Sequence, residues 1–233
     1  MKNFLKRYYI YILGAFLLAE TAIYIAFMVI ENAMGGDVTA LKYSGILLAF
    51  AVSVIAAPVN GRDGILLAVA LFFTAISDLF IFILYIYEAG VATFILVQIA
   101  YFIRIYFRFG RKPYISLAVR AVLIAVTLTA LGATGNLTLL TGLVAVYFPM
   151  LVCNAVESAI LIAKNKWNAI FFAGLVLFIG CDICVGLYNF TNVGISFPRE
   201  VLDFVGSAIW AFYLPSQTLL VLSGYYGKSY YEK

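Results

Sequence analysis

Eight apolar runs, each long enough to cross a lipid bilayer, constrain the fold of this chain more than any other feature. A transmembrane helix needs about 20 predominantly apolar residues. The runs cover residues 8–30, 41–57, 64–87, 91–107, 115–131, 137–163, 167–190 and 204–225. Because backbone groups in hydrocarbon must bond within their own segment, the runs are predicted to be helices. The sequence therefore predicts an all-α polytopic membrane protein with eight transmembrane helices in one domain, residues 1–233.

The composition excludes an ordinary soluble domain. Hydrophobic residues make up 65% of the chain and charged residues 11%, whereas soluble domains carry roughly 45–50% and about 25%. The net charge of +4 does not indicate nucleic acid, because the basic residues occupy short loops instead of one continuous stripe. The expected environment is the lipid bilayer.

The distribution of basic residues predicts the orientation of the chain in the membrane. Eleven lysines and arginines lie at the two termini and in the even-numbered loops, while Lys42 and Arg199 lie on the opposite side. Positive charge concentrates on the cytoplasmic side of membrane proteins. We therefore expect a multi-pass protein, in a bacterial cytoplasmic membrane, with both termini in the cytoplasm.

Glycine, proline and asparagine separate several of these runs. Turn residues occur at 58–61, which contain Pro58 and Gly61, at 88–90 and at 135–136. Such clusters favour reversals of the chain between helices. Each reversal is predicted to be short.

Two aspartates lie inside the predicted spans, at matching depths. Asp78 follows Asp63 by 15 residues and Asp182 follows Trp167 by 15, which places each about 22 Å from the basic side. An aspartate near the centre of a span costs roughly 2.5–3.5 kcal/mol. Either the two acids carry chemistry, or they hold helices together by hydrogen bonds.

The segments around the aspartates resemble each other. Residues 73–80 and 177–184 each carry one aspartate late in a span that starts at the basic side. The two spans run in the same direction, which would fit a parallel four-plus-four repeat.

Further polar side chains are expected at a similar level and could line a pocket beside the aspartates. Each also has a structural interpretation: a lysine can extend to the interface, a tyrosine can pack and a glutamine can bridge helices. If they converge, they are candidate substrate-binding residues. The set comprises Glu20, Lys42, Gln98, Tyr101, Tyr147, Tyr213 and Gln217.

No metal site or cofactor is predicted. The chain has no histidine, which is the commonest metal-binding side chain. Cys181 and Cys184 match C-x-x-C, but a single pair is a weak metal signal and two small residues in a packed helix explain it.

Several short motifs, in order along the chain, resemble those of a known family. Lys42-Tyr43 is similar to that family's Lys-Pro, Ser77-Asp78 to its Gly-Asp, and Gln98-Ile-Ala-Tyr101 to its His-x-x-Tyr. Residues 174–182 are similar to Gly-Ala-x-x-Phe-x-x-Ser-Asp, and residues 213–223 to Tyr-x-x-Ala-Gln-x-Leu-Ile-x-x-Ser. The family is that of the YhhN-like lysoplasmalogenases. This chain has tyrosine, serine and glutamine where the family has proline, glycine and histidine.

The resemblance implies a membrane-embedded hydrolase that cleaves the vinyl ether bond of a lysoplasmalogen to a fatty aldehyde and a glycerophospho-headgroup. The partner would be a lysophospholipid or related single-chain lipid. This chemistry needs an acid and a base, for which Asp78 and Asp182 are the candidates. The alternative is a small transporter or lipid-binding membrane protein that uses the same carboxylates.

Overall fold

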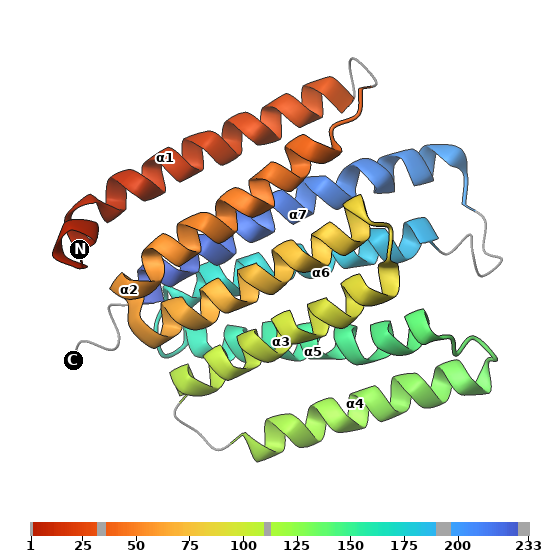
Figure 1. Ribbon diagram of the computed structural model, residues 1–233. Coiled ribbons are helices and arrows are strands. Elements are labelled where there is room, and N and C mark those ends of the chain that lie inside the picture. Colours follow the sequence, from red (N-terminus) through yellow and green to blue (C-terminus); the bar gives the residue numbers. More distant parts are fainter. Residues whose placement is uncertain (1, 32–35, 110–112, 190–196, 228–233) are drawn as a thin grey trace.

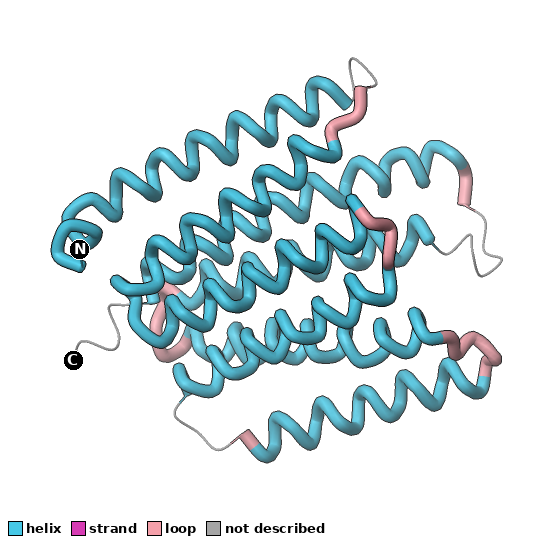
Figure 2. Tube along the Cα trace, viewed as in Figure 1, coloured by secondary structure: helices cyan, strands magenta, loops and turns pink. Residues whose placement is uncertain are grey.

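The computed structural model describes residues 2–31, 36–109, 113–189 and 197–227, and these residues form a bundle of long helices (Figure 1). Seven helices are long and apolar enough to cross a membrane, and the described residues contain no strand (Figure 2). The predicted all-α, multi-pass membrane architecture is confirmed. The helices are α1 (Lys2–Val29), α2 (Thr39–Asp78), α3 (Tyr87–Phe109), α4 (Tyr114–Ala133), α5 (Leu139–Ile162), α6 (Asn168–Asn189) and α7 (Arg199–Gly227).

Helix α2 joins two of the predicted runs, 41–57 and 64–87, and folds back on itself. Its 40 residues are helical except at Gly61, where φ is 62° and ψ is −142°, a conformation that glycine adopts without steric cost. The Tyr43 hydroxyl donates to the Ala75 carbonyl at 3.2 Å, although a straight helix would separate these residues by about 48 Å. The arms 39–60 and 62–78 therefore lie side by side (Figure 1).

In the structure, α2 is a single element that contains two of the predicted spans. The predicted number of eight spans therefore stays a prediction. The four-plus-four repeat also stays a prediction. The reversal itself falls where the sequence predicted it. Proline and glycine at 58–61 end the first arm, and one glycine with positive φ is enough to turn the chain.

The next turn differs from its prediction. Helical structure after Asp78 continues through a short π-helical segment, η2 (Leu79–Ile83), and the chain turns at 84–86, where Tyr85 has φ 55°. Residues 88–90, predicted to be a turn, lie in the first turns of α3. Gly90 is required for packing instead: its backbone contacts Ile81 too closely for a Cβ, and its carbonyl accepts from Ser77 Oγ at 2.6 Å.

Five helices enclose the interior of the bundle. Helix α2 packs on α3, α3 on α5, α5 on α6, α6 on α7, and α7 on α2. Helix α1 lies outside this ring against α2 and α7, and α4 lies outside it against α5 (Figure 1). The only buried side chain of α4 is Arg120, so most of α4 is suited to contact lipid.

Local interactions set the ends and spacing of the ring helices. Thr138 caps α5, because its Oγ1 accepts the Thr141 backbone N–H at 3.2 Å while Thr141 Oγ1 accepts the Thr138 N–H at 2.8 Å. Helices α6 and α7 approach closely at Gly174, where a Cβ would meet Leu220 at 3.0 Å. Ser216 Oγ donates to the Gly174 carbonyl at 2.8 Å across this contact.

Candidate active site in the bundle interior

Asp78 ends α2 with its carboxyl group inside the ring. Its side chain is 1% exposed. The Tyr213 hydroxyl, from α7, donates to Asp78 Oδ2 at 2.7 Å, while Asp78 Oδ1 has no hydrogen-bond partner among the described residues. A buried polar atom is normally hydrogen-bonded, so Oδ1 is the atom of this carboxyl that is free to meet a ligand.

Asp182 also accepts a hydrogen bond from a tyrosine. The Tyr147 hydroxyl, from α5, donates to Asp182 Oδ2 at 2.6 Å. Tyr147 is buried, while Asp182, on α6, is half-buried. Four different helices therefore supply the two Asp–Tyr pairs.

The two pairs lie close to each other, and we call Asp78 and Asp182 the aspartate pair. Their carboxyl groups interact electrostatically. Two phenylalanines join the tyrosines: the ring of Phe178 is 5.6 Å from those of Tyr213 and Phe94, and Phe94 is 5.6 Å from Tyr147. Two acids that are 104 residues apart in sequence are thus held in one aromatic environment.

Lys42 lies beside this site, behind Trp210. Its Nζ is 5.0 Å from the centroid of the Trp210 ring, which in turn is 5.4 Å from the Tyr213 ring. The ammonium group forms an ion pair with Glu31 Oε1 at 2.6 Å. The structure therefore brings Lys42 near the aspartate pair with its charge already compensated.

Glu20 and Gln217 are buried and have no hydrogen-bond partner among the described residues. Both carboxyl oxygens of Glu20, which is 3% exposed, and both amide atoms of Gln217 are unpaired within the described part of the chain. Glu20 Oε2 lies against Gly45 and Leu214, at the contact of α1, α2 and α7. Gln217 follows Tyr213 by one turn of α7. Gln217 therefore belongs to the same ring helix as Tyr213, which binds Asp78, while Glu20 belongs to α1, outside the ring.

Gln98 and Tyr101 project from α3 and are fully buried. Gln98 Oε1 accepts from Asn154 Nδ2 at 3.0 Å, and Gln98 Nε2 has no partner in the part of the chain that the structure describes. The Tyr101 ring packs on Phe171 at 5.5 Å, and its hydroxyl has no partner in the described residues. In the described residues, the bundle interior thus contains unpaired hydrogen-bond donors on Gln98 and Tyr101 in addition to the carboxyl groups of the aspartate pair.

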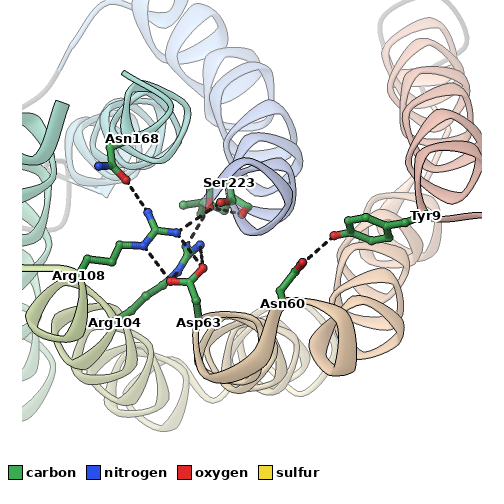
Figure 3. A network of polar contacts seen from close by, with 8 residues as sticks. Tyr9, Asn60, Asp63, Arg104, Arg108, Asn168 and Ser223 are labelled. Atoms are coloured by element: carbon green, nitrogen blue, oxygen red, sulfur yellow. Dashed lines mark hydrogen bonds and ion pairs between the residues drawn. The ribbon is translucent and has the colours of Figure 1, made fainter. Parts of the chain in front are cut away.

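A second polar centre, not predicted from the sequence, lies toward the other end of the bundle. We call it the arginine cluster: Asp63, Arg104, Arg108, Asn168 and Ser223 (Figure 3). Each arginine makes two hydrogen bonds to Asp63, all at 2.8–2.9 Å. Arg104 also donates to Ser223 Oγ and Arg108 to Asn168 Oδ1, both at 2.8 Å.

A signal for the arginine cluster was present in the sequence. Arg104 and Arg108 are four residues apart, so they share one face of a helix. Asp63 is an acid at the basic end of its span. The pairing could not be deduced, because it depends on which helices are neighbours.

A third polar group ties the outer helix α4 to the ring. Arg120 forms an ion pair with Glu157 Oε1 at 2.7 Å and donates to Asn154 Oδ1 at 2.7 Å. Ser116 contacts both Glu157 and Arg120. Since Asn154 also binds Gln98, this network reaches the bundle interior.

The described residues hold no group of three or more histidine, cysteine, aspartate or glutamate side chains that could bind a metal. Cys153, Cys181 and Cys184 are buried, free thiols. The C-x-x-C pair is part of the packed face of α6.

Fold and site together define a class of protein: a polytopic membrane protein with two neighbouring aspartates, each bound by a tyrosine, in its bundle interior. The chain belongs to the YhhN family, whose sequence model matches residues 38–224. This range contains both aspartates and the ring helices, except the last three residues of α7, and leaves out α1. No curated protein and no solved structure gives a significant match.

Proposed function

We propose that this protein hydrolyses the vinyl ether bond of a lysoplasmalogen, releasing a fatty aldehyde and a glycerophospho-headgroup. The observation that carries the proposal is the aspartate pair, in which each carboxyl accepts one tyrosine hydroxyl and the Oδ1 atom of the buried Asp78 has no partner among the described residues. Membership of the YhhN family agrees with this activity.

The reaction needs one carboxyl group that gives a proton and one that receives a proton. The acid transfers its proton to the vinyl carbon that is not bonded to oxygen, which leaves an oxocarbenium ion. Water adds to the cationic carbon and loses a proton to the second carboxylate. The hemiacetal then collapses: its hydroxyl gives its proton to the first carboxylate, its C–O bond to glycerol breaks, the glycerol oxygen takes the proton held by the second carboxyl, and the aldehyde forms. Two neighbouring carboxyls that share one proton can divide these roles.

Tyr147 and Tyr213 orient the two carboxyls. Each hydroxyl binds only Oδ2, so Oδ1 of each carboxyl is the proposed reacting oxygen. A hydrogen bond to a carboxylate also stabilises the charged form that each aspartate passes through. The tyrosines are thus positioning residues in this mechanism.

The proposed substrate is a single-chain lipid that enters from the bilayer. Glu20, Lys42, Gln98, Tyr101, Tyr147, Tyr213 and Gln217 form the proposed polar surroundings. Lys42 borders these surroundings, because one tryptophan ring separates its ammonium group from Tyr213, but its charge is already paired with Glu31.

The proposed topology has eight spans. About 20 apolar residues cross the bilayer core, and the two arms of α2, residues 39–60 and 62–78, lie antiparallel, so each arm would cross once. The loop at Gly61 and the arginine cluster would then face the cytoplasm, together with both termini.

The test is to incubate the purified protein with lysoplasmenylethanolamine and measure the aldehyde released. The wild-type protein is expected to release aldehyde, and Asp78→Asn and Asp182→Asn are each expected to lose the activity. Asp203→Asn is the matched control, because Asp203 is an exposed aspartate on α7.

Two results would overturn the proposal. If the wild-type protein releases no aldehyde while it still binds the lipid, a lipid-binding or transport function replaces hydrolysis. If both aspartate variants keep the wild-type rate, the aspartate pair has no part in the reaction.

A further inference from the structure

We propose that Gln98, Tyr101 and Gln217, here called the middle donors, bind the phosphodiester of the lipid substrate, and that the arginine cluster supplies the favourable charge behind it. This inference rests on the proposed function and names the part of the substrate that the site recognises. The headgroup would then point toward the arginine cluster.

The middle donors are three of the buried side chains with unpaired polar atoms in the described residues. Gln98 Nε2, Tyr101 Oη and Gln217 Nε2 each lack a partner in the part of the chain that the structure describes, and all three side chains are 0% exposed. An unpaired buried polar group costs about 1–3 kcal/mol. These donors, two on α3 and one on α7, are suited to a ligand rich in acceptors, and a phosphodiester is such a ligand.

The middle donors lie between the aspartate pair and the arginine cluster. Helix α7 bonds Asp78 through Tyr213 and Arg104 through Ser223, so it runs from one centre to the other. Gln217 is four residues beyond Tyr213, about 6 Å along the helix, and six residues before Ser223, about 9 Å.

Helix α3 supplies the other two donors, Gln98 at about the level of Gln217 and Tyr101 nearer to the arginine cluster. Gln98 precedes Arg104 by six residues, also about 9 Å, and Tyr101 precedes it by three, about 4.5 Å. Gln98 and Gln217 are therefore at equal height above the contact of Arg104 with Ser223.

This spacing fits the substrate. Three glycerol carbons and one ester oxygen separate the vinyl ether oxygen from phosphorus, a distance comparable to one helical turn, about 5.4 Å. With the vinyl ether at the aspartate pair, the phosphorus reaches the level of Gln217.

The charge of the arginine cluster favours an anion at this position. Its two guanidinium groups share a single carboxylate, Asp63, which leaves one positive charge uncompensated. Arg104 is 0% exposed and Asp63 is 11% exposed in their side chains, so solvent screens this charge weakly. Lys42, by contrast, already pairs with Glu31 at 2.6 Å.

The test compares two uncleavable ligands of equal chain length: a 1-O-alkyl-glycerophosphoethanolamine and the corresponding 1-O-alkylglycerol, which lacks the phosphodiester. The wild-type protein is expected to bind the phospholipid at least about tenfold more tightly. Gln98→Leu and Tyr101→Phe are each expected to weaken phospholipid binding about tenfold, because each removes a donor to a charged group. Binding of the alkylglycerol should not change.

The control is Tyr106→Phe, which removes a hydroxyl from an exposed tyrosine of the same helix. Tyr101→Phe is a mild substitution, because the lost hydroxyl has no protein partner in the described residues. Its thermal unfolding in detergent should match that of the wild type, which separates binding from folding.

Three outcomes decide the matter. An unchanged preference for phospholipid in both variants would overturn the inference. Inorganic phosphate that binds as tightly as the phospholipid would show a free-phosphate site and would overturn the lipid assignment. A protein that shows the expected binding pattern but cleaves no vinyl ether overturns only the proposed hydrolysis, because neither ligand needs to react.

Discussion

The arginine cluster and the aspartate pair are two buried polar centres in one bundle, and they differ in how completely they are satisfied. In the arginine cluster, both oxygens of Asp63 accept from both arginines, and serine and asparagine take further donors. In the aspartate pair, each carboxyl accepts a single hydroxyl, and Asp78 Oδ1 accepts none from the described residues.

This difference separates a structural centre from a chemical one. A buried charge that is fully hydrogen-bonded has little capacity left for a ligand, and its loss leaves its partners unpaired. A buried carboxyl with an unpaired oxygen is expensive for the fold and available to a substrate. The two centres should therefore respond in opposite ways to the same substitution of aspartate by asparagine.

The largest expected effect is on catalysis in Asp78→Asn. The hydrolysis rate should fall about 10²–10⁴-fold, the usual contribution of a general acid or base. The thermal unfolding temperature should stay close to that of the wild type, because the amide has nearly the same shape and can still accept from Tyr213. Aldehyde release and thermal unfolding in detergent, measured on one preparation, check both expectations. If Asp78→Asn instead lowers the unfolding temperature while the folded protein keeps the wild-type hydrolysis rate, Asp78 has a structural role and not a catalytic one.

Asp63→Asn should have the opposite result. Removing one partner of a buried ion pair costs about 3–5 kcal/mol, and here two arginines lose their carboxylate at once. Chemical denaturation in detergent should show this loss of stability, while the molecules that remain folded keep a measurable hydrolysis rate. Unchanged stability would show that the arginine cluster does not hold the bundle together.

Parts of this comparison could be predicted from the sequence. Counting about 1.5 Å per residue from the basic side placed Asp78 and Asp182 at equal depth, and in the structure the tyrosines that bind them are joined through Phe178 and Phe94. The partners could not be predicted. Which tyrosine reaches which aspartate depends on the rotation of each helix about its axis, and near-continuous apolar runs leave that rotation undefined.

The turns between helices were also only partly predictable from the sequence. Gly61 was recognisable because a proline precedes it and only glycine adopts its positive φ easily. Gly90 was misread as a turn residue, because a glycine needed for close packing on Ile81 has the same appearance in a sequence. The pairing of Lys42 with Glu31 was also missed, since Glu31 lies just beyond the predicted span 8–30.

Tyr213→Phe is expected to have an intermediate effect. It removes the hydrogen bond that orients Asp78, and a hydrogen bond to a charged group contributes about 1.5–3 kcal/mol. The hydrolysis rate should fall about tenfold or somewhat more, with a smaller change in KM. The pH–rate profile should also shift, because Asp78 loses a donor, whereas a purely structural role would leave the profile in place. Tyr188→Phe, at an exposed tyrosine on α6, is the control.

Glu31→Gln should have the smallest effect. The ion pair with Lys42 is half-exposed on the glutamate side, where 41% of the side chain is accessible. Pairs of this kind contribute about 0–1 kcal/mol. Thermal unfolding should barely change. A large loss of stability would place this ion pair with the arginine cluster as a structural centre.

The most direct measurement is hydrolysis of lysoplasmenylethanolamine in D₂O, with the aldehyde trapped by reduction and analysed by mass spectrometry. Protonation of the vinyl carbon predicts one deuterium on the carbon next to the aldehyde group, with release abolished in Asp78→Asn and Asp182→Asn. Aldehyde without this deuterium, or the same labelled aldehyde from both variants at the wild-type rate, would contradict the account.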